Sequence, residues 1–104
     1  MRYKEFLEYL EANLDSYHTF INKAINYQQN KNEQRQKKAR WENERIEKAA
    51  YEMWKKAMEN LYNNLKHEIK SDMPCSWTNY IAQHEILESV NESINDMDFS
   101  DNAA

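Results

Sequence analysis

Glycine is absent from this chain of 104 residues, and proline and cysteine each occur once. Glycine supplies the positive φ angles that phosphate-binding loops, tight hairpins and nucleophile elbows require. Its absence therefore excludes nucleotide loops of the Walker, Rossmann and kinase types. The single cysteine, Cys75, cannot form a disulfide within the chain, so we expect a protein of the reducing cytoplasm.

Long apolar runs are also missing, because no stretch approaches the roughly 18 apolar residues of a membrane-spanning helix. The first residues include Glu5, Glu8 and Glu11, where a secretory signal would be uncharged. With 40% hydrophobic and 31% charged residues, the chain is too apolar for complete disorder and too polar for a membrane protein. We expect one domain with a modest core and no membrane partner.

Residues with good helix propensity dominate, and three stretches repeat their apolar residues with helical spacing. They predict helices over residues 3–27, 33–70 and 77–94. The first apolar stripe is Tyr3, Leu7, Leu10, Leu14, Tyr17, Ile21 and Ala24, widened by Phe6, Phe20 and Ile25. The second is Ile46, Ala50, Met53, Ala57, Leu61, Leu65 and Ile69. The third is Trp77, Tyr80, Ile81, Leu87, Val90 and Ile94.

The boundaries between these helices have their own signals. Asn30 and Asn32 are the expected site of the first turn, because asparagine tolerates the left-handed conformation when glycine is absent. Pro74 disfavours helix in the residue before it and ends the second helix, and Ser76 is the expected N-cap of the third. Residues 95–104 are predicted to be an acidic tail.

These elements predict an all-α fold in which residues 1–94 form a single helical domain. Two long antiparallel amphipathic helices with a shorter third helix can close as a helical hairpin or a three-helix bundle. The heptad spacing from Tyr3 to Ala24 also permits a coiled-coil homodimer. That arrangement would be needed if the polar stretch 28–45 were one continuous helix, since the first stripe could not then fold back on the second. The sequence leaves both arrangements open.

Charge is divided unevenly along the chain. Residues 1–70 hold all 14 Lys and Arg against 11 acids, whereas residues 71–104 hold seven acids and no Lys or Arg. Residues 1–70 therefore carry a net charge of +3, and residues 71–104 carry a net charge of −7. The candidate binding residues of the basic stretch are Lys31, Arg35, Lys37, Lys38, Arg40, Trp41 and Arg45.

On a continuous helix, Lys31, Arg35, Lys38 and Arg45 would share one face beside Trp41. Such a stripe can follow a phosphate backbone, and the indole can stack on a base or fill a protein pocket. The alternative is an ordinary solvated helix face, in which the basic side chains pair with interleaved glutamates.

The acidic C-terminal third of the chain, residues 71–104, offers a second candidate surface. Its residues are Glu85, Glu88, Glu92, Asp96, Asp98 and Asp101. A row of carboxylates can imitate phosphates and occupy a basic groove on a nucleic-acid-binding protein. The alternatives are a solubilising tail, or neutralisation of the basic stretch within the fold or between subunits.

Patterns that support catalysis are incomplete in this sequence. His84 and Glu85 begin a segment similar to the zinc-binding HExxH helix, but Glu88 stands where the second histidine is required. We expect His84 to be buried or half-buried on an apolar face, with a hydrogen bond to a neighbouring group. Cys75 has no identifiable histidine base, so we interpret it as a small core residue. We therefore expect no metal, no cofactor and no enzymatic activity.

The 13 asparagines, the helical content and the acidic C-terminal third resemble a class of small helical accessory proteins. Phages and conjugative elements of low-GC Gram-positive bacteria carry these proteins. Some of them are anti-CRISPR inhibitors, which bind an effector nuclease or interfere with its guide RNA. The resemblance implies an inhibitor with a protein or ribonucleoprotein partner, and it transfers no residue role to this chain.

Together, these features predict a non-enzymatic macromolecule-binding protein, an inhibitor or accessory factor of a nucleic-acid-handling complex. One alternative is a helical RNA- or DNA-binding protein that uses the basic stretch 31–45. The other is a structural coiled-coil assembly subunit, which would depend on the heptad between Tyr3 and Ala24.

Overall fold

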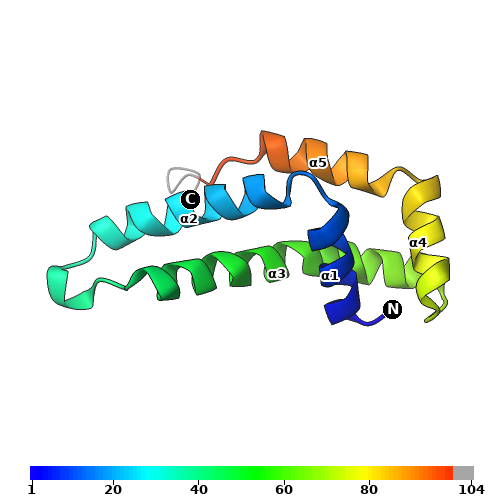
Figure 1. Cartoon of the computed structure of the whole chain (residues 1–104), viewed down its shortest axis with the longest axis horizontal. Coiled ribbons are helices and arrows are strands. Elements are labelled where there is room, and N and C mark those ends of the chain that lie inside the picture. Colours follow the sequence, from blue (N-terminus) through cyan, green and yellow to red (C-terminus); the bar gives the residue numbers. More distant parts are fainter. Residues whose placement is uncertain (100–104) are drawn as a thin grey trace.

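The computed structural model describes residues 1–99, which form five α-helices and one short 3-10 turn without β-strands. Helices α2 (Tyr17–Glu33) and α3 (Asn43–Ile69) run antiparallel along the long axis of the molecule, as Figure 1 shows. The 3-10 turn η1 (Lys37–Ala39) lies in the loop between them. The molecule is elongated, with principal dimensions of 49 × 24 × 23 Å. The predicted all-α fold and helical hairpin are confirmed, but three shorter helices accompany the hairpin where one was predicted.

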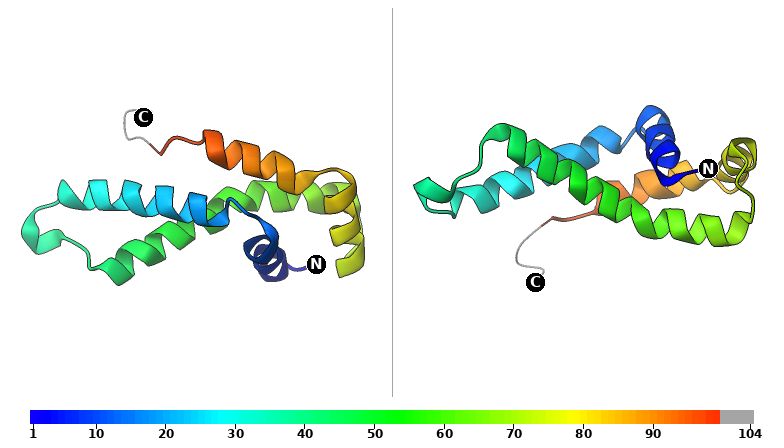
Figure 2. Two further views of the ribbon diagram at one scale, coloured as in Figure 1. Left: turned by 45° about the horizontal axis from the view of Figure 1, so that its top comes forward. Right: turned by 90° about the horizontal axis from the view of Figure 1, so that it is seen from below.

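Three shorter helices pack around one half of this hairpin. Helix α1 (Tyr3–Asn13) lies across α3, and α4 (Pro74–Gln83) turns the chain at the end of α3. Helix α5 (Ile86–Asp96) then returns alongside the first half of α2, which Figure 2 shows from two further sides. No helix within residues 1–99 is long and apolar enough to cross a membrane.

The predicted helix over residues 3–27 is wrong in one respect, because it is broken between α1 and α2. Leu14 leaves the helical conformation with φ −97° and ψ 112°. The buried Ser16 then donates hydrogen bonds from its backbone N–H and its hydroxyl to Oδ1 of Asn91, at 3.0 and 2.5 Å. Because Asn91 lies 75 residues later in the chain, nothing in the local pattern signals this break.

The predicted helix over residues 77–94 is also divided, into α4 and α5. Glu85 adopts a left-handed conformation with φ 51° and turns the chain between the two helices. Helix α4 begins at Pro74, with Met73 rather than the predicted Ser76 as its N-cap. Proline is well suited to the first position of a helix, because its missing N–H has no partner there in any case. Pro74 therefore starts the third helical segment, whereas α3 ends earlier, at Ile69, with Lys70 in a left-handed conformation of φ 54°.

The predicted acidic tail is partly structured. Asn95 and Asp96 belong to α5. Nζ of Lys23 on α2 donates to the backbone carbonyls of Ile94, Asn95 and Met97, at 2.9, 3.0 and 2.9 Å. This ammonium group satisfies carbonyls that the end of a helix leaves without partners. Phe99 then packs on Phe20, with ring centroids 5.1 Å apart. The rest of the predicted tail, from residue 100 on, lies outside the described residues.

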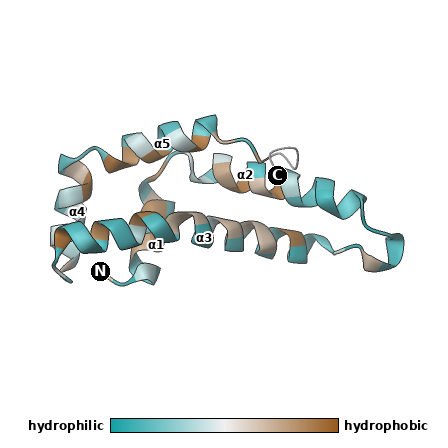
Figure 3. Ribbon diagram, turned by 180° about the vertical axis from the view of Figure 1, so that it is seen from behind, coloured by the Kyte–Doolittle hydropathy of each residue, from teal (hydrophilic) through white to brown (hydrophobic). Residues whose placement is uncertain are grey.

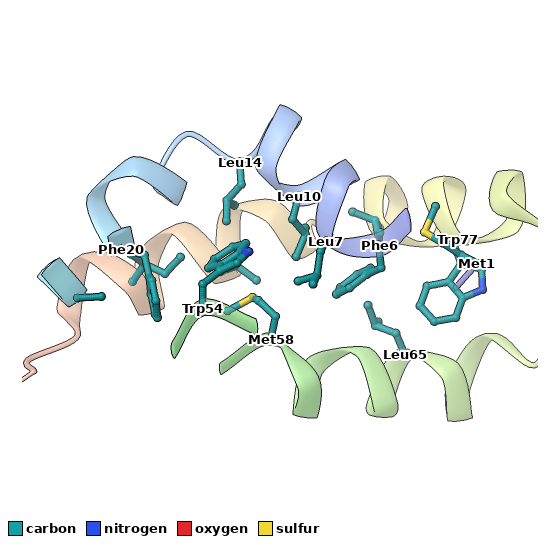
Figure 4. Close-up of a cluster of buried hydrophobic side chains, with 14 of the residues drawn as sticks. Met1, Phe6, Leu7, Leu10, Leu14, Phe20, Trp54, Met58, Leu65 and Trp77 are labelled. Carbon is teal, nitrogen blue, oxygen red and sulfur yellow. The ribbon is translucent and has the colours of Figure 1, made fainter. Parts of the chain in front are cut away.

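One continuous core joins all five helices. Figure 4 shows Trp54 beside Leu14, Phe20 and Met58 at one end of this core. At the other end, Trp77 of α4 stacks on Tyr62 with ring centroids 5.1 Å apart and meets Phe6 at 5.9 Å. The Trp77 indole N–H also donates to the carbonyl of Ser71 at 2.7 Å, which ties α4 to the end of α3.

The apolar stripe that suggested a coiled-coil dimer is covered within a single chain. Leu7, Leu10, Leu14 and Ala24 are all buried in the core that α3 completes. A dimer built on this seam would have to displace α3 from its own chain. The heptad spacing therefore reflects packing within one chain, and this stripe is not free to form a coiled-coil contact with a second copy.

A carboxylate is held inside this packing by two aromatic donors. Oε2 of Glu11 on α1 accepts hydrogen bonds from the Tyr51 hydroxyl at 2.8 Å and from the Trp54 indole N–H at 3.2 Å. Burial raises the pKa of Tyr51 to about 12, and the hydrogen bond to Glu11 and its negative charge act in the same direction. Burial is also the main cause of the raised pKa of Tyr3, Tyr17 and Tyr62.

The raised pKa values of these four tyrosines predict that the folded protein loses stability in alkali. A pKa that is raised on folding favours the folded state fully below the ordinary value of 10, and this contribution disappears as the pH rises through the pKa of the folded state, which for Tyr51 is about 12. We expect tyrosinate absorbance from these four residues to appear together with loss of the helical circular dichroism signal. Reversible ionisation of every tyrosine near pH 10 with the helices intact would contradict this expectation.

Candidate nucleic-acid interface

The outer half of the α2–α3 hairpin extends beyond the core. No residue between Ala24 and Ile46 is buried. Figure 3 shows hydrophilic residues predominating along this outer half, whereas hydrophobic residues gather where the five helices meet. We call residues 25–45 the hairpin arm. It contains the whole predicted basic set, at the opposite end of the molecule from α4 (Figure 1).

The predicted start of the second helix at residue 33 is wrong. Helix α2 continues to Glu33, and the chain then forms a loop before α3 starts at Asn43. Arg40 and Glu42 are extended, with ψ angles of 139° and 163°. This stretch has no apolar face to pack, and helices in proteins depend mainly on such packing for their stability. The expected basic stripe along one continuous helix does not form.

Asn32 takes part in the turn, but by a different mechanism from the predicted one. It lies within α2, and its side chain bridges to the far side of the loop. Its Nδ2 donates to the carbonyl of Trp41 at 3.1 Å, and its Oδ1 accepts from the Trp41 backbone N–H at 2.7 Å. The side-chain amide thus replaces a pair of backbone hydrogen bonds and closes the loop. Apart from the presence of an asparagine, no sequence pattern indicates this pairing.

Trp41 is half-buried by two arginines. The guanidinium carbon Cζ of Arg35 lies 3.9 Å from the centroid of the Trp41 ring, and that of Arg45 lies 4.4 Å from it. Nη1 of Arg35 also donates to Oδ1 of Asn32 at 3.1 Å. Each cation–π contact of this kind contributes about 0.5–1 kcal/mol at an exposed site. The indole is therefore less available for stacking on a base than the sequence predicted, and it positions two arginines instead.

The other basic residues surround this cluster on the outside of the arm. Lys37, Lys38 and Arg40 are exposed on the loop, and Nη2 of Arg40 donates to the carbonyl of Glu33 at 3.3 Å. Nζ of Lys31 lies 5.1 Å from the centroid of the Tyr27 ring. Among residues 1–99 one ion pair forms, on α3 outside the arm, between Lys55 and Glu52. The cations of the arm are thus not neutralised by ion pairs with described acids.

A shallow pocket of about 300 Å³ opens beside the cluster, and it is lined by Arg40, Trp41, Glu42, Glu44 and Arg45. The two glutamates lower the local positive potential at this opening. The geometry therefore favours contact with a phosphate at the exposed loop cations rather than inside the pocket.

The predicted acidic surface lies on and beside α5. Glu85, Glu88 and Glu92 are exposed, as are Asp96 and Asp98. Asp101 lies outside the described residues. No ion pair joins the described acids of this surface to the hairpin arm, so the hypothesis of neutralisation within the fold gains no support.

Two residues considered for chemistry lie in other environments than predicted. His84 is exposed and packs on Tyr80, with ring centroids 4.1 Å apart, because the break between α4 and α5 removes it from the apolar face. Cys75 is exposed in the first turn of α4 rather than buried in the core. Within the described part of the chain, no group of three or more His, Cys, Asp or Glu side chains could hold a metal ion.

Comparison with protein-family models, with curated proteins and with solved structures found no match.

Proposed function

We propose that this chain is a non-enzymatic binding protein that docks on a nucleic-acid-handling complex, as an inhibitor or accessory factor. The hairpin arm makes the contact with phosphates. The observation that supports this proposal is the arm itself, which carries six Lys and Arg residues outside the core and without ion pairs to the described acids. The resemblance noted in the sequence suggests CRISPR effectors as the class of complex.

The distribution of charge supports contact with a polyanion. Residues 31–45 carry six basic residues against three acidic ones, which gives +3, whereas residues 71–99 carry six acids and no Lys or Arg. The arm would therefore be attracted to a polyanion, whereas the acidic residues on and beside α5 would be repelled by it. Each Lys or Arg that neutralises a phosphate releases a counterion, which makes the affinity fall as salt rises.

Preorganisation supports the same contact. The Asn32 side chain fixes the loop at Trp41, and the indole holds Arg35 and Arg45. Side chains that are already ordered lose less conformational entropy when they bind a ligand. A short arm with a fixed turn can thus present several cations to one phosphate backbone.

A salt titration tests the proposal. We expect fluorescently labelled single-stranded RNA to bind the purified protein with a log–log slope of affinity against salt near −4, if all six cations contact phosphates. Competition with polyglutamate is the matched control, because it offers negative charge without phosphates. Absence of RNA binding at low salt, or binding that does not change with salt, would contradict the proposal.

A further inference from the structure

An apolar groove of about 270 Å³ lies between α3 and α5. Two helices contribute its apolar lining residues: Met58, Leu61, Ile86, Val90, Ile94 and Met97. Ser89 and Ser93 complete the wall on α5. The groove does not belong to the hairpin arm. Met58, Val90 and Ile94 form its floor as members of the core, whereas Leu61, Ile86 and Met97 are half-buried.

A row of carboxylates borders the groove on its α5 side. Glu92 and Asp96 are one turn apart, so they lie on one face of α5, next to the serines of the groove wall, and Glu85 immediately precedes the first residue of the helix. All three side chains are exposed, and the chain contains no Lys or Arg after Lys70. The Lys23 ammonium lies at the Met97 end of this row, where it binds backbone carbonyls, and among residues 1–99 no ion pair joins it to the three carboxylates. An apolar surface with a negative rim is complementary to an apolar surface with a positive rim.

The dimensions of the groove suit a helix. Its α5 wall extends from Ile86 to Met97, which is about 16 Å at the rise of an α-helix. A bound helix that places apolar side chains at i, i+4 and i+7 needs about 10 Å of this length. The two methionine side chains, Met58 and Met97, can adapt to anchors of different shape.

We propose that the groove between α3 and α5 binds an amphipathic helix of a partner protein whose apolar face is flanked by Lys and Arg. This site is independent of the proposed contact between the arm and nucleic acid. A second copy of this chain is a poorer occupant, because a twofold contact through this face would bring two negative rims together. The hairpin arm of another copy has the right charge but no buried apolar stripe to place in the groove.

A pair of synthetic helical peptides provides the test. Each has about 18 residues with leucine at i, i+4, i+7 and i+11, flanked by Lys and Arg in one peptide and by Glu in the other. We expect saturable binding of the basic peptide, measured by fluorescence anisotropy, and binding at least about tenfold weaker for the acidic peptide. Amide shifts in NMR spectra should be concentrated in α5 and at Met58 and Leu61.

Two variants test the location. Ser93→Arg places a long side chain in the groove and adds a positive charge beside its negative rim, and it should weaken binding of the basic peptide by about tenfold or more. Asn63→Arg is the matched control, because Asn63 is exposed on α3 and does not line the groove. Circular dichroism establishes that both variants are folded.

Three results would overturn the proposal: no saturable binding, equal affinity for the two peptides, or binding that Ser93→Arg leaves unchanged in a folded protein. A dimer in light scattering that Ser93→Arg dissociates would also overturn it, because the occupant would then be a second copy. Since the arm takes no part in this test, these failures would leave the RNA titration unaffected.

Discussion

Replacing Lys37, Lys38 and Arg40 together by alanine is expected to weaken binding of single-stranded RNA by about 10–100-fold at moderate salt. These three side chains are the exposed cations of the loop at the tip of the hairpin arm. Removing three phosphate contacts should also make the log–log slope of affinity against salt shallower by about 2. Fluorescence anisotropy over a series of salt concentrations measures both quantities.

The matched control removes the same total charge elsewhere. Lys4, Lys56 and Lys66 are exposed on α1 and α3, outside the arm. Their replacement by alanine should change the affinity by less than about threefold, because only the net charge of the molecule is altered. Equal losses in the two triple variants would show that binding depends on overall charge, and the arm would lose its assigned role.

Replacing Trp54 by alanine is expected to lower the free energy of unfolding by about 3–5 kcal/mol, a large part of the stability of a domain of this size. Trp54 is fully buried, and its ring meets those of Tyr17 and Phe20 with centroids 4.9 and 5.4 Å away. The substitution also leaves Glu11 with one aromatic donor fewer. Urea denaturation followed by circular dichroism measures the change.

Trp41 provides the comparison for this variant. It is also a tryptophan, but it lies in the arm and packs on arginines rather than in the core. Trp41→Ala should therefore lower the free energy of unfolding by only about 1 kcal/mol. Similar losses for the two variants would mean that the arm and the core unfold as one unit held by both indoles, contrary to the structure described.

The apolar periodicity located most of the core. Leu7, Leu10 and Leu14 of the first stripe are buried as predicted, because a helical repeat identifies the face that must leave water. On α3 the buried face is rotated relative to the predicted apolar stripe. Trp54, which lies outside that stripe, is buried, whereas Ala57, which belongs to it, is exposed. Packing of large rings against Phe20 and Tyr17 decides this rotation, and single-helix spacing contains no information about the neighbours.

The breaks within helices were predicted less well than the helices themselves. The boundary between the second and third predicted helices was identified from Pro74, although α3 ends at a left-handed Lys70 four residues before the proline. The break at Leu14 was not, because the group that stabilises it is the side chain of Asn91 on α5. Similarly, the end of α5 is capped by Lys23 from α2, which the C-terminal sequence does not reveal.

The candidate site, too, was predicted only in part from the sequence. The sequence identified the basic residues of 31–45 and placed Trp41 among them, but it arranged them as a stripe on one helix. The structure gathers them around a loop, where the Asn32 side chain and two guanidinium groups hold Trp41. The groove between α3 and α5 had no sequence signal, because its walls belong to two apolar faces that each look like ordinary core.

The sequence by itself determined that the chain is helical, which faces of its helices are apolar, and how charge is divided between residues 1–70 and 71–104. These properties depend on composition and on spacing within a few turns, so they are local. The tertiary structure alone decided the breaks after α1 and α4, which residues cap the helices, and which surfaces stay uncovered. Those outcomes depend on hydrogen bonds and ring contacts between residues up to 79 positions apart, which no local pattern encodes.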